Sequence, residues 1–150
     1  MMSERFPAWQ LARKAYVGFL ESMFLRFFAS SLVRPWLRSP SAAYSDALFR
    51  VSIGVAAPFV CLVAILVLST KATVPDLLPG RSAFFIVLTV YGALSPATYF
   101  TLDPRFRHYV ETPERVRNDG EKPRTRGEVL FELVSWLCAL GSVIVLPMTL

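Results

Sequence analysis

Three stretches of this chain contain no charged residue over about the length needed to cross a bilayer: Val51 to Thr70, Ser82 to Leu102 and Leu133 to Leu150. They are 20, 21 and 18 residues long. Because an α-helix rises about 1.5 Å per residue and the hydrocarbon core is about 30 Å thick, roughly 20 apolar residues span it. We therefore expect an all-α integral membrane protein with three transmembrane helices.

The residues outside these runs are too few for an obvious soluble domain. Of the 150 residues, 54% are hydrophobic and 18% are charged, which is typical of the membrane class. We expect a single membrane domain over residues 1–150, divided into a basic amphipathic arm (1–46), a first span (47–70), a second span (82–102), a basic inner-side loop (103–127) and a third span (128–150).

The basic residues divide very unequally among the segments outside the runs. Seven lie before the first run, six of them in the arm and the seventh at Arg50, and seven lie in the loop before the third run, whereas the hairpin loop between the first two runs holds two, Lys71 and Arg81. Short loops rich in Lys and Arg stay on the cytoplasmic side, or on the matrix side in mitochondria by analogy. We therefore expect a mitochondrial or bacterial inner membrane, with the N-terminus on the matrix or cytoplasmic side and the C-terminus opposite.

The arm shows helical periodicity. Its apolar residues fall on one helical face, with charged and polar residues opposite, and this face consists of Trp9, Ala12, Tyr16, Phe19, Leu20, Met23 and Phe27. The pattern predicts an N-terminal amphipathic helix lying in the membrane interface. The alternative is a fourth span over residues 17–33, which would bury Glu21 and Arg26 at a cost of a few kcal/mol each.

Caps and turn residues predict where the helices begin and end. Ser45 and Asp46 form a candidate N-cap for the first spanning helix. The hairpin over residues 71–81 contains Pro and Gly residues that suit a tight turn between antiparallel helices. The loop over residues 103–127 carries three Pro, two Gly and mixed charge with little apolar material, so we expect it to be extended or to drape over a partner.

The second span is the most polar of the three. It contains Pro96, which favours a kink, and a Gly and several hydroxyl side chains: Thr89, Tyr91, Gly92, Ser95, Thr98, Tyr99 and Thr101. A span of this composition packs against protein more than against lipid.

Two acidic residues, Glu128 and Glu132, lie one helical turn apart just before the third apolar run. We interpret Glu132 as a helix-interface acid that pairs with a basic side chain at the interface; the candidates are Arg50, Arg105 and Arg107. The alternative is a proton-carrying carboxylate, because acids inside a membrane are commonly functional.

Motifs for catalysis or cofactor binding are absent from the sequence. His108 is the only histidine, and no CxxC, HExxH, GxGxxG, GxxxxGK or GxSxG pattern occurs. Cys61 and Cys138 lie inside expected spans, where Cys usually serves as a small apolar filler. We therefore expect no enzymatic activity, no catalytic or cofactor-binding residue, no metal and no nucleic-acid partner.

Arginines and aromatic residues gather near the headgroup level on the basic side. Clustered Arg beside aromatic side chains there is typical of contact with an anionic phospholipid such as cardiolipin. The candidate headgroup residues are Arg34, Trp36, Arg38, Arg105 and Arg107.

The missing chemistry, the aromatic arm and the polar second span favour a non-catalytic accessory subunit of a larger multi-subunit membrane complex. We expect its partners to be other membrane-protein subunits, in an energy-converting membrane of the respiratory or ATP-synthase type. One alternative is a small homo-oligomeric pore or transport component, with a path lined by Thr89, Ser95, Thr98 and Glu132. Another is a membrane regulator that binds one partner.

Overall fold

The computed structural model describes residues 8–37, 39–78, 81–120 and 122–148. Every regular element in these ranges is a helix, which confirms the all-α class. Along the chain the elements are α1 (Ala8–Leu32), α2 (Pro40–Thr73), the 3-10 helix η1 (Pro75–Leu77), α3 (Ser82–Phe106), the 3-10 helix η2 (Arg107–Glu111), α4 (Pro113–Gly120) and α5 (Arg126–Met148).

Two helical segments of the described chain are long and apolar enough to cross a membrane. They are α2, with 34 residues, and the continuous stretch Ser82–Glu111, with 30 residues. At about 1.5 Å per residue, α2 is about 50 Å long, so a membrane about 30 Å thick would cover only part of it. These two segments contain the first and second expected spans. The third expected span, which overlaps the 23-residue α5, stays a prediction.

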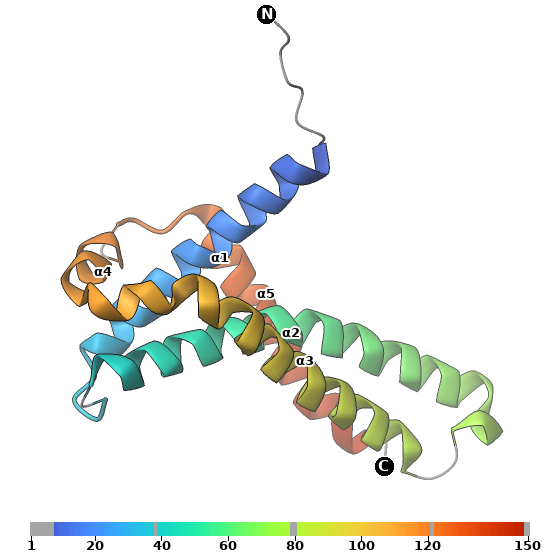
Figure 1. The fold of residues 1–150 in the computed structure, drawn as a ribbon. Helices are drawn as coiled ribbons and strands as arrows, with labels where there is room; N and C mark the ends of the chain where they lie inside the picture. Colours follow the sequence, from blue (N-terminus) through green and yellow to red (C-terminus); the bar gives the residue numbers. More distant parts are fainter. Residues whose placement is uncertain (1–7, 38, 79–80, 121, 149–150) are drawn as a thin grey trace, which may run out of the picture.

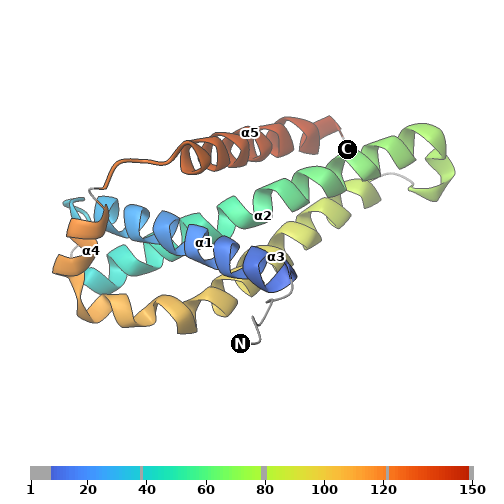
Figure 2. The same cartoon turned by 90° about the horizontal axis from the view of Figure 1, so that it is seen from above.

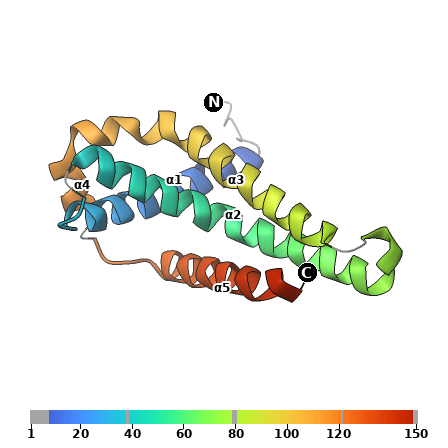
Figure 3. The ribbon, with the colours of Figure 1, turned by 90° about the horizontal axis from the view of Figure 1, so that it is seen from below.

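α2 is the central helix of the molecule. Figures 2 and 3 show α3 along one side of α2 and α5 along the other, while α1 lies against the first half of α2. The α2–α3 hairpin extends to one end of the molecule, and α4 and the α1–α2 corner lie at the opposite end (Figure 1). The chain therefore has a hairpin end and a corner end.

α2 begins earlier than the sequence analysis predicted. Ser39 is its N-cap, the Ser39 hydroxyl accepts a hydrogen bond from the Ala42 backbone N–H at 3.2 Å, and Pro40 occupies the first turn. Pro suits this position because its missing N–H would have no partner there. The predicted cap at Ser45 and Asp46 is therefore wrong, and both residues lie inside α2.

An aromatic core holds the corner end together. Phe24 of α1 is fully buried, and its ring stacks on Phe106 of α3 with 4.7 Å between centroids and meets Tyr44 of α2 edge-on at 5.4 Å. The Tyr44 hydroxyl donates a hydrogen bond to a carboxylate oxygen of Asp103 at 2.8 Å. Burial of such rings is a large apolar contribution to folding, so this core fixes α1 to α2 and α3.

A second, smaller core joins α2 to α3 toward the hairpin. Its buried residues are all small or β-branched: Val60, Ala64, Val67, Ala83 and Val87. Small side chains let the two helix backbones approach closely, which is how helices associate where lipid is as apolar as a Leu side chain. This close packing is compatible with a hairpin that crosses a membrane.

The expected extended loop over residues 103–127 is mostly helical. α3 continues to Phe106, η2 and α4 follow, and α4 packs back on α1 of the same chain. Val116 of α4 is fully buried in the aromatic core, with Tyr109 and Val110 of η2 packed against it. The prediction failed because these few apolar residues form a stable packing only against α1, which is distant in sequence.

The amphipathic face predicted for α1 is not confirmed. Leu20 and Met23 of that face are buried, but Trp9 and Tyr16 are 62% and 47% exposed, and the fully buried Phe24 lies off it. Burial in α1 follows position along the helix, because the first half extends beyond α2 and α4 whereas the second half packs against them.

Candidate functional site

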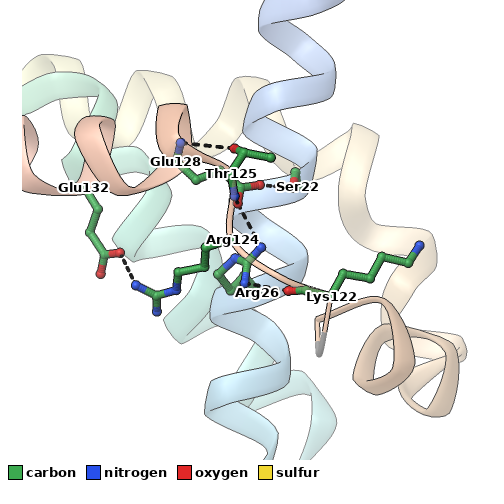
Figure 4. Close-up of polar contacts among 7 residues, drawn as sticks. All are labelled: Ser22, Arg26, Lys122, Arg124, Thr125, Glu128 and Glu132. Carbon is green, nitrogen blue, oxygen red and sulfur yellow. Dashed lines mark hydrogen bonds and ion pairs between the residues drawn. The ribbon is translucent and has the colours of Figure 1, made fainter.

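The beginning of α5 is organised around Glu128, drawn in Figure 4. The Glu128 carboxylate accepts a hydrogen bond from the Thr125 backbone N–H at 3.0 Å, and the Thr125 hydroxyl accepts one from the Glu128 backbone N–H at 3.3 Å. This reciprocal pair is a capping box, which satisfies two backbone donors at a helix N-terminus. Glu128 therefore fixes where α5 begins.

The same carboxylate joins α5 to α1. Arg26 Nη2 lies 2.8 Å from Glu128 Oε2, and the Ser22 hydroxyl donates a hydrogen bond to the other carboxylate oxygen. The side chains of Arg26 and Glu128 are only 13% and 4% exposed. Because hydrogen bonds to charged groups are the strong ones, this buried pair is a clamp between the first and last helices.

Arg26 also holds the segment between α4 and α5. Its Nη1 donates a hydrogen bond to the Lys122 carbonyl at 3.1 Å. The Lys122 ammonium in turn donates to Asp119 of α4 at 2.8 Å, and this hydrogen bond lowers the pKa of the Asp119 carboxyl. One arginine of α1 thus fixes the chain on both sides of the turn into α5.

Glu132, the predicted helix-interface acid, is paired with Arg124, whose Nη1 lies 2.9 Å from Glu132 Oε2. The Glu132 side chain is 25% exposed, so this pair is more accessible than the Arg26–Glu128 clamp. Both acids therefore pair with basic side chains, but the expected partners were wrong; these were Arg50, Arg105 and Arg107. The actual partners come from α1 and from the residues just before α5.

A second polar cluster lies at the corner between α1 and α2. Asp46 accepts a hydrogen bond from the Ser31 hydroxyl at 2.6 Å and lies 3.1 Å from Arg50 Nε and 3.7 Å from Arg34 Nη1. The Arg34 guanidinium also lies over the Trp36 ring, 5.7 Å from its centroid. One carboxylate therefore faces two arginines.

The predicted headgroup residues form two groups at the corner end. Arg34 and the 70% exposed Trp36 lie at the α1–α2 corner, while Arg105 and Arg107 lie where α3 passes into η2 (Figure 1). Arg107 is 78% exposed and 4.0 Å from Asp103, and Arg105 lines a cleft beside the first half of α1. Arg38 lies outside the described residues.

A groove of about 440 Å³ runs between α1, α2 and α5. Arg34, Arg50 and Glu132 are its charged residues, and the remaining walls are mainly apolar, with Met23 and Phe27 from α1, Val51 and Ile53 from α2, and Phe131 and Trp136 from α5. This volume lies within the range of small-molecule sites, about 300–1,000 Å³. Sequence reasoning missed the groove because it is formed by three helices.

Direct contacts join α2 and α5 within the groove and beyond it. The Ser135 hydroxyl donates a hydrogen bond to the Gly54 carbonyl at 3.0 Å. Further along, the free thiols of Cys61 on α2 and Cys138 on α5 lie within hydrogen-bonding reach of each other. The two cysteines thus mark the register of α5 against α2.

One signal in the sequence could have found the clamp. Thr125 and Glu128 have the T-x-x-E spacing of a capping box directly before an apolar run, so the start of α5 was readable. The role of Arg26 was not readable, because its contact with Glu128 spans 102 residues.

Comparisons with known proteins give no assignment. No family model matches the chain. No curated protein and no solved structure matches it either.

Proposed function

We propose that this chain is a non-catalytic accessory subunit of a multi-subunit complex in an energy-converting inner membrane, of the respiratory or ATP-synthase type. α2, α3 and α5 are its three spans. The fourteen basic residues outside the hairpin favour a matrix or cytoplasmic location for the N-terminus and the corner end, and an opposite location for the hairpin and the C-terminus.

The observation that carries the proposal is an exposed small-residue face on α3. Five residues spaced three and four apart are exposed together, namely Thr89, Gly92, Ala93, Pro96 and Ala97. A Cβ atom built on Gly92 meets nothing within 4 Å. Small residues are enriched where membrane helices pack against one another, because they let backbones approach closely. We therefore infer that another membrane helix covers this α3 small-residue face.

The outward face of α5 has the opposite character. Its exposed residues are large and apolar: Leu130, Leu133, Val134, Trp136, Leu137, Leu140 and Ile144. Such side chains suit direct contact with acyl chains, so we infer that this face of α5 meets lipid, as do the exposed Phe85 and Phe100 at either end of the α3 small-residue face. The contrast between α5 and the middle of α3 supports docking at the α3 small-residue face.

The charged side chains favour a structural role over catalysis. Glu128 is held by Arg26, Glu132 by Arg124 and Asp46 by two arginines. These interactions join helices to each other or fix a helix terminus. The three carboxylates therefore stabilise the fold through their ion pairs.

The arrangement favours the homo-oligomeric pore less. Thr89 is exposed on α3, Ser95 is buried, and Glu132 lies on α5, on the other side of α2. The Thr98 hydroxyl donates a hydrogen bond to the Leu94 carbonyl of its own helix. These groups do not share one surface that a ring of copies could turn toward a common path.

Two glycine substitutions test the docking face. Gly92→Leu adds bulk to the α3 small-residue face, and Gly141→Leu adds the same bulk to α5; neither new Cβ meets an atom within 4 Å, so both variants should fold. After expression in the native host, the assembled fraction is measured by blue-native electrophoresis. We expect Gly92→Leu to leave the complex and Gly141→Leu to stay in it.

The outcomes separate the hypotheses. Assembly of Gly92→Leu at the level of the unmodified chain would show that α3 does not dock there. Release of a small homo-oligomer, without other subunits, would favour the pore instead.

A further inference from the structure

The groove between α1, α2 and α5 is cationic at one end and apolar along its length. Arg34 and Arg50 line it where α2 leaves the corner, whereas Gly54, Ser135 and Ala139 line it further toward the hairpin end. In the proposed orientation, the arginines lie at headgroup level and the apolar part lies in the membrane. This polarity matches an amphiphile with an anionic head.

Each of the two arginines uses only one of its guanidinium nitrogens in contact with Asp46. Both face the single carboxylate of Asp46, which Arg50 contacts through Nε and Arg34 through one terminal nitrogen. Glu132, the other acid of the groove, is occupied by Arg124. The groove end therefore carries a surplus positive charge, and Arg guanidinium donors suit the oxygens of a phosphate group.

We propose that this groove binds one anionic phospholipid, with its phosphate on Arg34 and Arg50 and an acyl chain between α2 and α5. The site uses Arg50, which the sequence did not single out for lipid, and does not use Arg105 or Arg107, which lie outside the groove. The proposal rests on the membrane location of α2 but is independent of the subunit role, so either can fail without the other.

The apolar walls select a lipid over a soluble phosphate. Phe131, Ile53 and Trp136 line the groove, and the Trp136 side chain is 63% exposed. A soluble phosphate ester would contact the arginines alone, whereas a lipid would also cover these side chains.

Native mass spectrometry of the full chain in neutral detergent tests the proposal, with dioleoyl phosphatidylglycerol as the probe and dioleoyl phosphatidylcholine for comparison. We expect one retained phosphatidylglycerol and weaker binding of phosphatidylcholine. Arg50→Gln should weaken phosphatidylglycerol binding by at least about tenfold, because a hydrogen-bonded charge pair is lost. Arg107→Gln, a matched change at the same end, should leave binding unchanged.

Three further variants separate lipid binding from surface attraction and from misfolding. Ala139→Phe fills the groove and should weaken binding with both arginines intact, whereas Val134→Phe, on the outward face of α5, should not. Asp46→Asn removes the carboxylate that competes for the arginines and should strengthen binding. A damaged fold would weaken it, so the sign distinguishes the two.

Three results would overturn the proposal. The first is an equal loss in Arg107→Gln and Arg50→Gln, which indicates general surface charge. The second is full binding in Ala139→Phe. The third is displacement of the lipid by soluble glycerol phosphate, which indicates a phosphate site with no role for the acyl chain.

Discussion

Replacement of Glu128 with Ala should destabilise the chain more than any other single change to a charged residue outside the corner. The substitution leaves Arg26, whose side chain is 13% exposed, without its ionic partner. Breaking a buried pair in this way costs about 3–5 kcal/mol, and loss of the capping box adds about 1 kcal/mol. Arg26 keeps its hydrogen bond to the Lys122 carbonyl and some access to water, so we expect a total near the lower limit, about 3 kcal/mol.

Glu132→Ala is the matched control. The Arg124–Glu132 pair has an N–O distance of 2.9 Å, close to the 2.8 Å of the Arg26–Glu128 pair, but its side chains are 51% and 25% exposed. The substitution should cost no more than about 1 kcal/mol. Unfolding is followed by far-UV circular dichroism as SDS is added to the protein in dodecyl maltoside. Adding Arg26→Met to Glu128→Ala should lower the free energy of unfolding little further, because the double variant no longer contains the unpaired Arg26 charge. Equal costs for Glu128→Ala and Glu132→Ala would refute the reasoning.

Three other predictions follow from the packing and the proposed orientation. Phe24→Ala should cost about 3–5 kcal/mol in the same SDS titration, because Phe24 is fully buried, whereas Phe100→Ala, at a 71% exposed position, should cost far less. Mild oxidation with copper phenanthroline should form a disulfide between Cys61 and Cys138 within one chain, detected as a mobility shift under non-reducing conditions. Cys61→Ser should abolish the shift, and absence of the disulfide in the unmodified chain would contradict the α2–α5 register. In a chain lacking both cysteines, an impermeant maleimide should label Thr73→Cys from the hairpin side and Thr112→Cys only after permeabilisation, and the reverse would invert the orientation.

The helices could be predicted where their signal is local. The runs at 51–70 and 82–102 gave the cores of α2 and α3, because span length and the absence of charge are read residue by residue. The start of α2 was misplaced because two successive candidate caps compete, and Ser39 followed by Pro40 is the one used. The competing candidate, Asp46, instead pairs with two arginines.

The rest depends on contacts between distant parts of the chain. α4 is helical beside α1 although half of its residues are charged, because Val116 is buried in the aromatic core. Pairing of the two acids with basic groups was predictable, but their partners were not, since charge alone does not distinguish Arg26 from Arg50. The groove likewise needs three helices in register, and no single segment of sequence encodes it.

The most direct test of the subunit role is extraction of native membranes with a mild detergent, followed by blue-native separation and mass spectrometry of whatever migrates with this chain. We expect co-migration with a large membrane complex of the oxidoreductase or ATP-synthase type. Migration of the chain alone, or as a small homo-oligomer, would contradict it.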